Sequence, residues 1–186
     1  IVSRDRPEAL RRCLTGVGQL QYAPFEVIVV ADPAGIAVAR DMVFAEALKL
    51  VTYDSPNISA ARNLGIAEAA GEVVAFIDDD AVPEPLWLRH LLEPAQRPGV
   101  AAMTGFVRGR NGISFQYRAR QLNALGEPEN LDVDPETPSI LHPPPGGAIK
   151  TEGTNMAFRR DVLVEVGGFD PAFHYYLDET DLNMRL

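Results

Sequence analysis

Three consecutive aspartates, Asp78, Asp79 and Asp80, form the strongest chemical feature of the chain. They directly follow residues 72–77, an apolar run typical of a strand that is buried on both faces. Neighbouring carboxylates repel one another, and a divalent cation such as Mg²⁺ or Mn²⁺ would relieve that repulsion. Because Mg²⁺ is usually held by one or two carboxylates together with ligand phosphates, the run predicts a metal–diphosphate site. A solvated acidic turn is the alternative.

An arginine near the start of an expected helix forms a second candidate site. In the segment 57–65 (NISAARNLG), Ser59 lies near the helix start and Arg62 falls in the first turns. Backbone N–H groups at a helix N-terminus together with a guanidinium group favour an anion such as phosphate. For this segment taken alone, an ordinary surface arginine is the alternative.

Another expected helix begins near the end of the chain, and its opening turn carries Asp178, Glu179 and Asp181. Acidic side chains at this position interact favourably with the helix dipole. They also suit a general base, because repulsion among clustered carboxylates raises one of their pKa values. Both interpretations stay open from these residues alone. A sharp turn expected at Gly167 and Gly168 would aim the helix at a cleft.

The segments that must position these side chains alternate between strand and helix patterns. Apolar runs predict strands, and apolar residues three and four apart predict helices, the first of them capped by Asp5. The alternation predicts an α/β fold with a mostly parallel central sheet flanked by helices. Ligands bind beyond the carboxyl ends of such strands, where Ser3, Asp32, Asp54 and residues 78–80 lie. Strands are expected at 1–2, 25–31, 49–53, 72–77 and 100–104, and later helices at 36–48, 59–70 and 83–95.

The composition argues against several classes of protein. The 186 residues include 17 Lys and Arg against 26 Asp and Glu, and a net charge of −9 does not suit a nucleic-acid partner. No apolar run approaches the roughly 20 residues of a membrane-spanning helix. The single cysteine, Cys13, lies on an apolar helical stripe and is expected to be a core thiol. The expected location is the cytoplasm, with peripheral association at the inner face of the membrane left open.

Residues 106–147 break the alternating pattern. Six of the 15 prolines lie between Pro128 and Pro145 among acidic residues, so an irregular loop or insertion is expected there. With little apolar surface to fix it, this stretch is expected to be mobile without ligands and to help form the acceptor side. A strand is expected over 149–158. Because the chain begins without Met and stops inside an expected helix, we expect one domain, 1–186, taken from a longer protein.

Seven segments in a fixed order resemble the inverting family 2 glycosyltransferases. They are SRDRP, VIVVAD, NISAARNLG, AFIDDD, GTNMAFRR, GGFD and DETDLNMRL. The resemblance covers about residues 1–105 and 153–186 and implies the GT-A nucleotide-diphospho-sugar transferase fold. It further implies that residues 1–105 form the nucleotide-binding half, and that 148–186 form the half with the acceptor site and the catalytic base.

The resemblance also implies roles on the donor side. It places the nucleobase in the loop that contains Ser3, Arg4 and Arg6. It makes Asp32 the acid that hydrogen-bonds the base, and it makes Arg62 a nucleotide contact.

The aspartate run corresponds to the family's D-x-D motif. Asp80 would be the direct metal ligand, with Asp78 as a second one, and Asp78 or Asp79 would face the ribose. The implied cofactor is Mn²⁺ or Mg²⁺.

The family's catalytic base comes from a Glu-Asp pair at the opening of the last helix. This chain has the reverse order, so Glu179 takes the position of the base and Asp178 is the second choice. The extra methylene changes the reach by roughly 1 Å, which is enough to matter for catalysis. On the acceptor side we expect His174, Asp181 and Asn155.

The implied reaction moves a sugar from a nucleotide-diphosphate donor, with a UDP-sugar as first choice, to a hydroxyl group of a glycan, a lipid-linked or another acceptor. Two alternatives remain. A sugar-nucleotide pyrophosphorylase shares the layout, but residues 3–7 lack its Gly-rich loop. A degenerate domain would only bind sugar nucleotide, and the intact acids at 78–80 and 178–179 argue against such decay.

Overall fold

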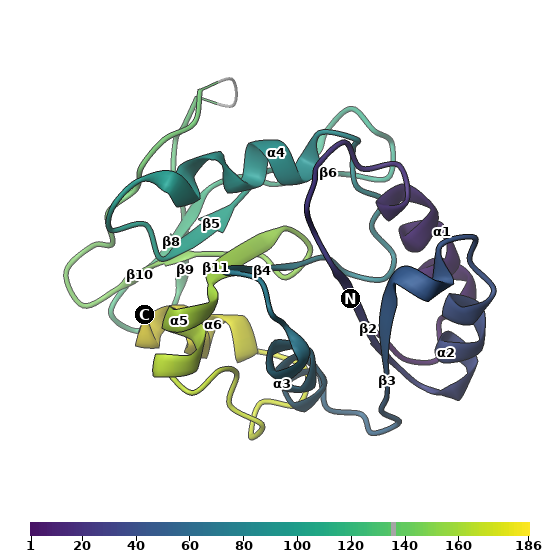
Figure 1. Cartoon of the computed structure of the whole chain (residues 1–186). Helices are drawn as coiled ribbons and strands as arrows, with labels where there is room; N and C mark the ends of the chain where they lie inside the picture. The colour runs from purple at the N-terminus through teal and green to yellow at the C-terminus, as the bar shows by residue number, and fades with distance from the viewer. Residues whose placement is uncertain (135–136) are drawn as a thin grey trace.

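The structure is a computed structural model that describes residues 1–134 and 137–186; residues 135–136, inside the expected insertion, lie outside the described part. A parallel and an antiparallel sheet, of three strands each, form the centre of the molecule (Figure 1). Residues 107–150 form two further sheets, one of three strands and one of two. Helices cover both central sheets (Figure 1).

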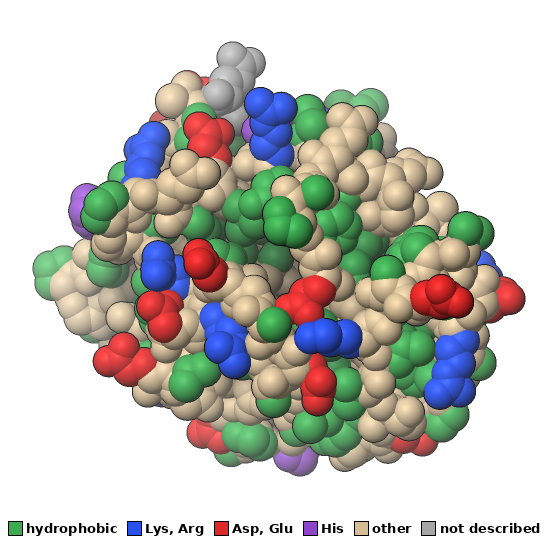
Figure 2. Space-filling model, viewed as in Figure 1, with side chains coloured by type: hydrophobic (Ala, Val, Ile, Leu, Met, Phe, Trp, Pro, Cys, Tyr) green, Lys and Arg blue, Asp and Glu red, His purple; other side chains and the backbone are tan. Residues whose placement is uncertain are grey.

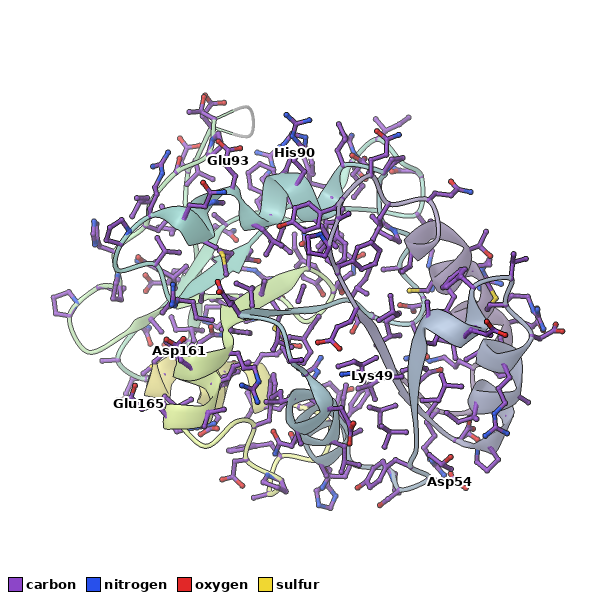
Figure 3. All side chains as sticks on the ribbon, in the orientation of Figure 1. Lys49, Asp54, His90, Glu93, Asp161 and Glu165 are labelled. Atoms are coloured by element: carbon purple, nitrogen blue, oxygen red, sulfur yellow. The ribbon has the colours of Figure 1, made fainter. Side chains whose placement is uncertain are left out.

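The parallel sheet has the order β1–β2–β3 (Val2–Ser3, Val27–Ala31 and Leu48–Thr52). The central strand β2 is apolar along its length, as expected for a strand that is covered on both faces, whereas β3 carries the polar Lys49 and Thr52. Val29 and Ala31 pack with α1 and α2 (Pro7–Val17 and Pro33–Arg40). On the other face, Lys49 Nζ donates to the Glu68 carbonyl of α3 (Ile58–Glu68) at 2.9 Å. Figure 3 shows Lys49 between β3 and α3, and Asp54 beyond the end of β3.

The helices differ from the sequence prediction mainly at their ends. The expected cap at Asp5 is wrong, because Asp5 has φ +60° and Arg6 is the N-cap of α1. The single helix expected over 36–48 is α2 followed by the short η1 (Ala45–Ala47). The helix expected over 83–95 is the shorter α4 (Trp87–Leu92), which η2 (Glu93–Gln96) continues because Pro94 cannot donate a helical hydrogen bond.

The expectation of a core thiol is confirmed. Cys13 lies on α1, is fully buried, and packs with Ile77 at the end of the apolar run. Burial raises the pKa of the Cys13 thiol to about 12, so the reactive thiolate is suppressed.

The second central sheet is antiparallel and has the order β4–β11–β5 (Val73–Phe76, Met156–Arg159 and Ala102–Thr104). The expected mostly parallel sheet is therefore a mixed arrangement, because β11 enters between β4 and β5 from a distant part of the chain. Met156 and Phe158 pack with α5 and α6 (Arg160–Glu165 and Asp178–Arg185), and Ala157 packs with α4.

The stretch 106–147 is more regular than expected, which corrects the prediction of an irregular loop. It contains the hairpin β6–β7 (Val107–Arg108, Phe115–Tyr117) and the strands β8 and β9 (Arg120–Leu122, Pro128–Asn130). Fully buried Leu122 anchors β8, which pairs with β10 (Ala148–Lys150). The strand expected over 149–158 is in fact two, β10 and β11, separated by a turn with a Glu152–Asn155 bridge.

All the described helices are short; the longest, α1 and α3, have 11 residues each. Within residues 1–134 and 137–186, none has both the length and the apolar character needed to cross a membrane.

Candidate active site

The carboxyl ends of β1 and β4 meet at the aspartate run. Ser3 Oγ donates to Asp79 Oδ2 at 2.6 Å, and Arg6 lies 3.0 Å from Asp79 Oδ1 and 3.0 Å from Asp80 Oδ2. The Asp79 side chain is 1% exposed. Burial raises the pKa of the Asp79 carboxyl, while the Ser3 hydrogen bond and the Arg6 charge act in the opposite direction. Asp79 thus joins the two strand ends from inside the fold.

Asp78 and Asp80 are the more accessible members of the run. Thr154 Oγ1 donates to Asp78 Oδ2 at 2.6 Å, which ties β4 to the turn between β10 and β11. The side chains of Asp78 and Asp80 are 36% and 41% exposed. Both can therefore offer carboxylate oxygens to a ligand outside the fold. Figure 2 shows acidic and basic side chains interspersed across the middle of one face of the molecule.

Arg62 connects this run with the acidic start of α6. Its guanidinium pairs with Asp178 and lies 3.2 Å from Glu179 Oε1 and 3.9 Å from Asp78 Oδ1. It also lies 5.0 Å from the centre of the Phe169 ring. The Arg62 side chain is only 4% exposed, so three carboxylates from two distant segments share one buried cation.

Polar side chains of α3 and of its N-cap residue, Asn57, hold the segment that leads into α6. Asn57 Nδ2 donates to the Pro171 carbonyl at 2.9 Å, and Ser59 Oγ donates to the Phe173 carbonyl at 2.5 Å. The amide of Asn63 bonds both the N–H and the carbonyl of Phe169. The motif NISAARNLG therefore positions the acids of α6 as well as supplying Arg62.

The two acids that open α6 differ in environment. Asp178 is buried and held by Arg62, and burial raises the pKa of its carboxyl against the lowering effect of that arginine. The Glu179 side chain is 22% exposed, and its Oε2 lies 4.0 Å from Lys150 Nζ. A Cβ atom on Gly153 would overlap Glu179 Oε1 and lie 2.5 Å from Arg62 Nη2, so a larger residue there would force both side chains to shift. Of the two acids, Glu179 has the better access to a substrate.

The carboxylates of residues 78–80 suit a divalent cation that is held partly by the protein and partly by a bound diphosphate. No cluster of three or more His, Cys, Asp or Glu that could hold a metal by itself is found among the described residues. A Mg²⁺ or Mn²⁺ ion bound together with a diphosphate needs only one or two carboxylates. Asp78 and Asp80 provide that number of accessible hard oxygen ligands.

The predicted nucleobase residues lie at the ends of β1 and β2. Asp32 is buried, and its two oxygens accept hydrogen bonds from the N–H groups of Gly35 (2.8 Å) and Asp5 (2.9 Å). It thus caps α2 and fixes the loop after β1. Arg4 lies 3.2 Å from Asp54 on the surface, with its side chain 41% exposed.

Two of the three predicted acceptor-side residues have structural partners. Asn155 accepts a hydrogen bond from Trp87 Nε1 at 2.8 Å and donates to the Phe106 carbonyl at 3.2 Å. Asp181 pairs with Arg185 at 2.6 Å. His174 is exposed, and its carbonyl accepts from the N–H of Ile58.

Sequence reasoning missed Gly153, Thr154 and Lys150. Lys150 is the last residue of β10, and Gly153 and Thr154 lie in the turn between β10 and β11. The fold brings these residues beside Asp78 and Glu179, which are distant in the sequence. The segment GTNMAFRR carried a signal for Gly153, because an isolated glycine inside an expected strand often marks a close approach of another group to the backbone.

Curated relatives resemble nearly the whole chain. It is 28% identical to the O-antigen biosynthesis protein RfbC of Myxococcus xanthus over 98% of this chain and 15% of that protein. It is 29% identical to the glucosyl-dolichyl phosphate glucuronosyltransferase of Haloferax volcanii over 90% of this chain and 53% of that protein. It is also 29% identical to the pre-mycofactocin glycosyltransferase of Mycobacterium tuberculosis, over 98% of this chain and 37% of that protein. The chain therefore spans about half or less of the length of these relatives.

Solved structures show the same fold. The mannosyltransferase PcManGT from Pyrobaculum calidifontis, in complex with GDP-Man and Mn²⁺, gives a TM-score of 0.69 at 18% identity, over 97% of this chain and 48% of that one. S. aureus TarS 1-349 in complex with UDP-GlcNAc gives a TM-score of 0.71 at 14% identity, over 99% of this chain and 51% of that one. The α/β architecture is thus that of the GT-A glycosyltransferases. Since the family model for glycosyl transferase family 2 matches residues 1–167, the chain belongs to that family.

Proposed function

We propose that this chain carries the catalytic domain of an inverting, metal-dependent glycosyltransferase. It would move a sugar from a nucleotide-diphosphate donor, with a UDP-sugar as first choice, to a hydroxyl group of a glycan or lipid-linked acceptor. The observation that carries the proposal is the position of Arg62, which contacts Asp178 and Glu179 and lies 3.9 Å from Asp78. Groups suited to a diphosphate and groups suited to a proton transfer thus meet at one place.

Residues 1–105 would bind the donor, and residues 148–186 would supply the base, with 106–147 beside the acceptor. The neighbours PcManGT and TarS, which were solved with GDP-Man and UDP-GlcNAc, support a nucleotide sugar as ligand. Arg6 is the cation best placed for the nucleotide, since its side chain is 51% exposed beside the aspartate run. Buried Asp79 would hold Ser3 by a hydrogen bond and Arg6 by an ion pair. We place the protein in the cytoplasm, which suits its free Cys13 thiol.

Asp80 and Asp78 would hold the Mn²⁺ or Mg²⁺ ion. When bound, such an ion offsets the negative charge that develops on the departing diphosphate. The neighbour PcManGT, solved with Mn²⁺, supports this choice of cofactor. The protein contributes Arg6 and Thr154, whose bonds to Asp80 and Asp78 orient the two carboxylates toward the outside of the fold.

Glu179 would act as the general base. The acceptor hydroxyl oxygen forms a bond to the anomeric carbon of the sugar while the bond between that carbon and the diphosphate oxygen breaks. The proton of the acceptor hydroxyl passes to the Glu179 carboxylate. A single displacement of this kind inverts the anomeric centre. Asp178, buried against Arg62, would be the positioning residue that keeps this arginine beside Glu179.

The test is a comparison of Glu179→Gln with Asp178→Asn in the full-length protein. A thermal-shift panel of UDP-, GDP- and dTDP-sugars with Mn²⁺ first identifies the donor, and transfer or hydrolysis of that donor is then measured. Loss of a general base costs ~10²–10⁴-fold in rate. We expect Glu179→Gln to lower turnover by that factor with donor affinity nearly unchanged, and Asp178→Asn to have a smaller effect. The reverse ranking would move the base to Asp178, and small effects in both would refute the assignment.

A further inference from the structure

The residues 106–120, called here the arginine hairpin, differ in charge from the rest of the molecule. They contain Arg108, Arg110, Arg118 and Arg120 and no acidic residue, in a chain whose net charge is −9. The hairpin comprises β6, β7 and the start of β8. Such a local concentration of cations acts as a separate electrostatic feature, because exposed charges farther away than about 8 Å are largely screened at physiological salt.

Aromatic rings pack against three of these four arginines. The Phe115 ring lies 5.4 Å from the guanidinium of Arg108 and 5.3 Å from that of Arg118, and it packs edge-on against Phe106. Arg120 lies 4.6 Å from the centre of the Tyr117 ring. A cation stacked on a ring keeps its charge, so this packing orders the arginines without neutralising them.

Within the described part of the chain, two of the four arginines pair with an acid and two do not. Arg108 lies 3.3 Å from Glu84, and Arg120 lies 2.9 Å from Glu152. Arg110 and Arg118 are exposed and have no acidic partner among the residues that the structure describes. These two side chains are therefore available to an external anion.

The tip of the hairpin presents an apolar side chain in an ordered turn. Asn111 Oδ1 accepts hydrogen bonds from the N–H groups of Ile113 and Ser114, both at 3.0 Å, and Gly112 has φ +68°. Gly109 N–H closes the turn on the Ser114 carbonyl at 2.7 Å. Ile113 is 81% exposed at this turn, three residues after Arg110.

We infer that the arginine hairpin docks the protein on an anionic phospholipid membrane. Lipid headgroups would bind Arg110 and Arg118, while Ile113 enters the boundary between headgroups and acyl chains. A membrane surface offers these two kinds of partner at once, whereas a soluble polyanion offers nothing to the exposed isoleucine. Each arginine near such a surface contributes about a fivefold increase in binding.

The hairpin adjoins the candidate active site. Arg108 pairs with Glu84, four residues after Asp80, and Asn155 holds the Phe106 carbonyl. Figure 1 shows β6 at one end of α4. If the proposed function holds, docking would bring the site to a lipid-linked acceptor, but the docking itself does not depend on any reaction.

The test is co-sedimentation of the full-length protein with vesicles of phosphatidylcholine alone or with 30% phosphatidylglycerol, at low ionic strength. We expect binding to the anionic vesicles that disappears toward 1 M salt, where the screening length is about 3 Å. Arg110→Gln/Arg118→Gln should weaken binding about 25-fold, at roughly fivefold per arginine. The matched control Arg40→Gln/Arg97→Gln removes the same charge from exposed positions outside the hairpin and should bind like the parent.

Ile113→Ser separates a membrane from a soluble polyanion. We expect this variant to bind anionic vesicles more weakly while its retention on a heparin column is unchanged. Equal vesicle binding by the parent protein, the double arginine variant and Ile113→Ser would overturn the proposal, as would no binding of the parent to anionic vesicles. Because the side chains of Arg110, Ile113 and Arg118 are all exposed, each variant should unfold at the same temperature as the parent protein. Equal melting temperatures would show that the fold is retained.

Discussion

Replacing Arg62 with methionine tests whether the buried cation holds the candidate site together. Arg62 and Asp178 are 4% and 5% exposed at their side chains, so removal of the guanidinium leaves a buried carboxylate without its main partner. Removing one member of a buried pair costs about 3–5 kcal/mol of the free energy of unfolding. Methionine keeps most of the packing on Phe169. For a chain of this size the loss corresponds to a fall of about 6–20 °C in the melting temperature.

The loss should depend on pH, and its sign follows from Asp178. Burial already raises the pKa of this carboxyl above the reference value of 3.8, and Arg62 opposes the shift. Without Arg62 the pKa rises further, so in the variant the folded state binds more protons than the unfolded state. Its stability therefore falls as the pH increases from 3.8 toward the folded-state pKa, by about 1.4 kcal/mol per unit within that window. The destabilisation should be largest at pH 7 and shrink toward pH 4.

The measurement is urea or thermal unfolding of both proteins from pH 4 to pH 7. The control is Arg11→Met, which breaks an exposed pair with Asp41 at 3.0 Å and should cost no more than about 1 kcal/mol at any pH. A loss below ~1 kcal/mol for Arg62→Met at pH 7, or a loss that does not change between pH 4 and pH 7, would refute the role given to this arginine.

Two further predictions concern the donor and the turn beside Glu179. Asp80→Ala should abolish Mn²⁺-dependent donor binding with the fold intact, as measured by nucleotide titration, while Asp161→Ala on α5, which Figure 3 shows at the edge of the molecule, should bind normally; unchanged affinity in Asp80→Ala would exclude it as a ligand. Gly153→Ala should lower turnover about 100-fold, since its Cβ would overlap Glu179 Oε1 and displace that carboxylate. Gly65→Ala, whose nearest contact would be an ordinary 3.6 Å, is the control, and parental turnover in Gly153→Ala would contradict the proposed position of the base.

Local patterns predicted the elements that carry most of the site. The strand before Asp78, the helix that contains Arg62 and the helix that begins at Asp178 are all present, because each has its own periodicity or apolar run. The path of residues 106–147 was not predictable in the same way. Its short strands have little apolar character and owe their pairing to partners such as β10, which lies outside that stretch.

The roles of single residues depended on contacts that no local pattern contains. The sequence predicts Arg62 as a nucleotide contact, and the structure adds that it lies beside Asp178, Glu179 and Asp78. This arrangement also accounts for Asn57, Ser59 and Asn63, whose bonds to residues 169–173 set the distance between α3 and α6. Because burial makes an uncompensated charge expensive, the acids of α6 and the arginine of α3 require one another. The same requirement links the end of β4 to α6, so a substitution of Glu179 should also alter the environment of Asp78 through Arg62.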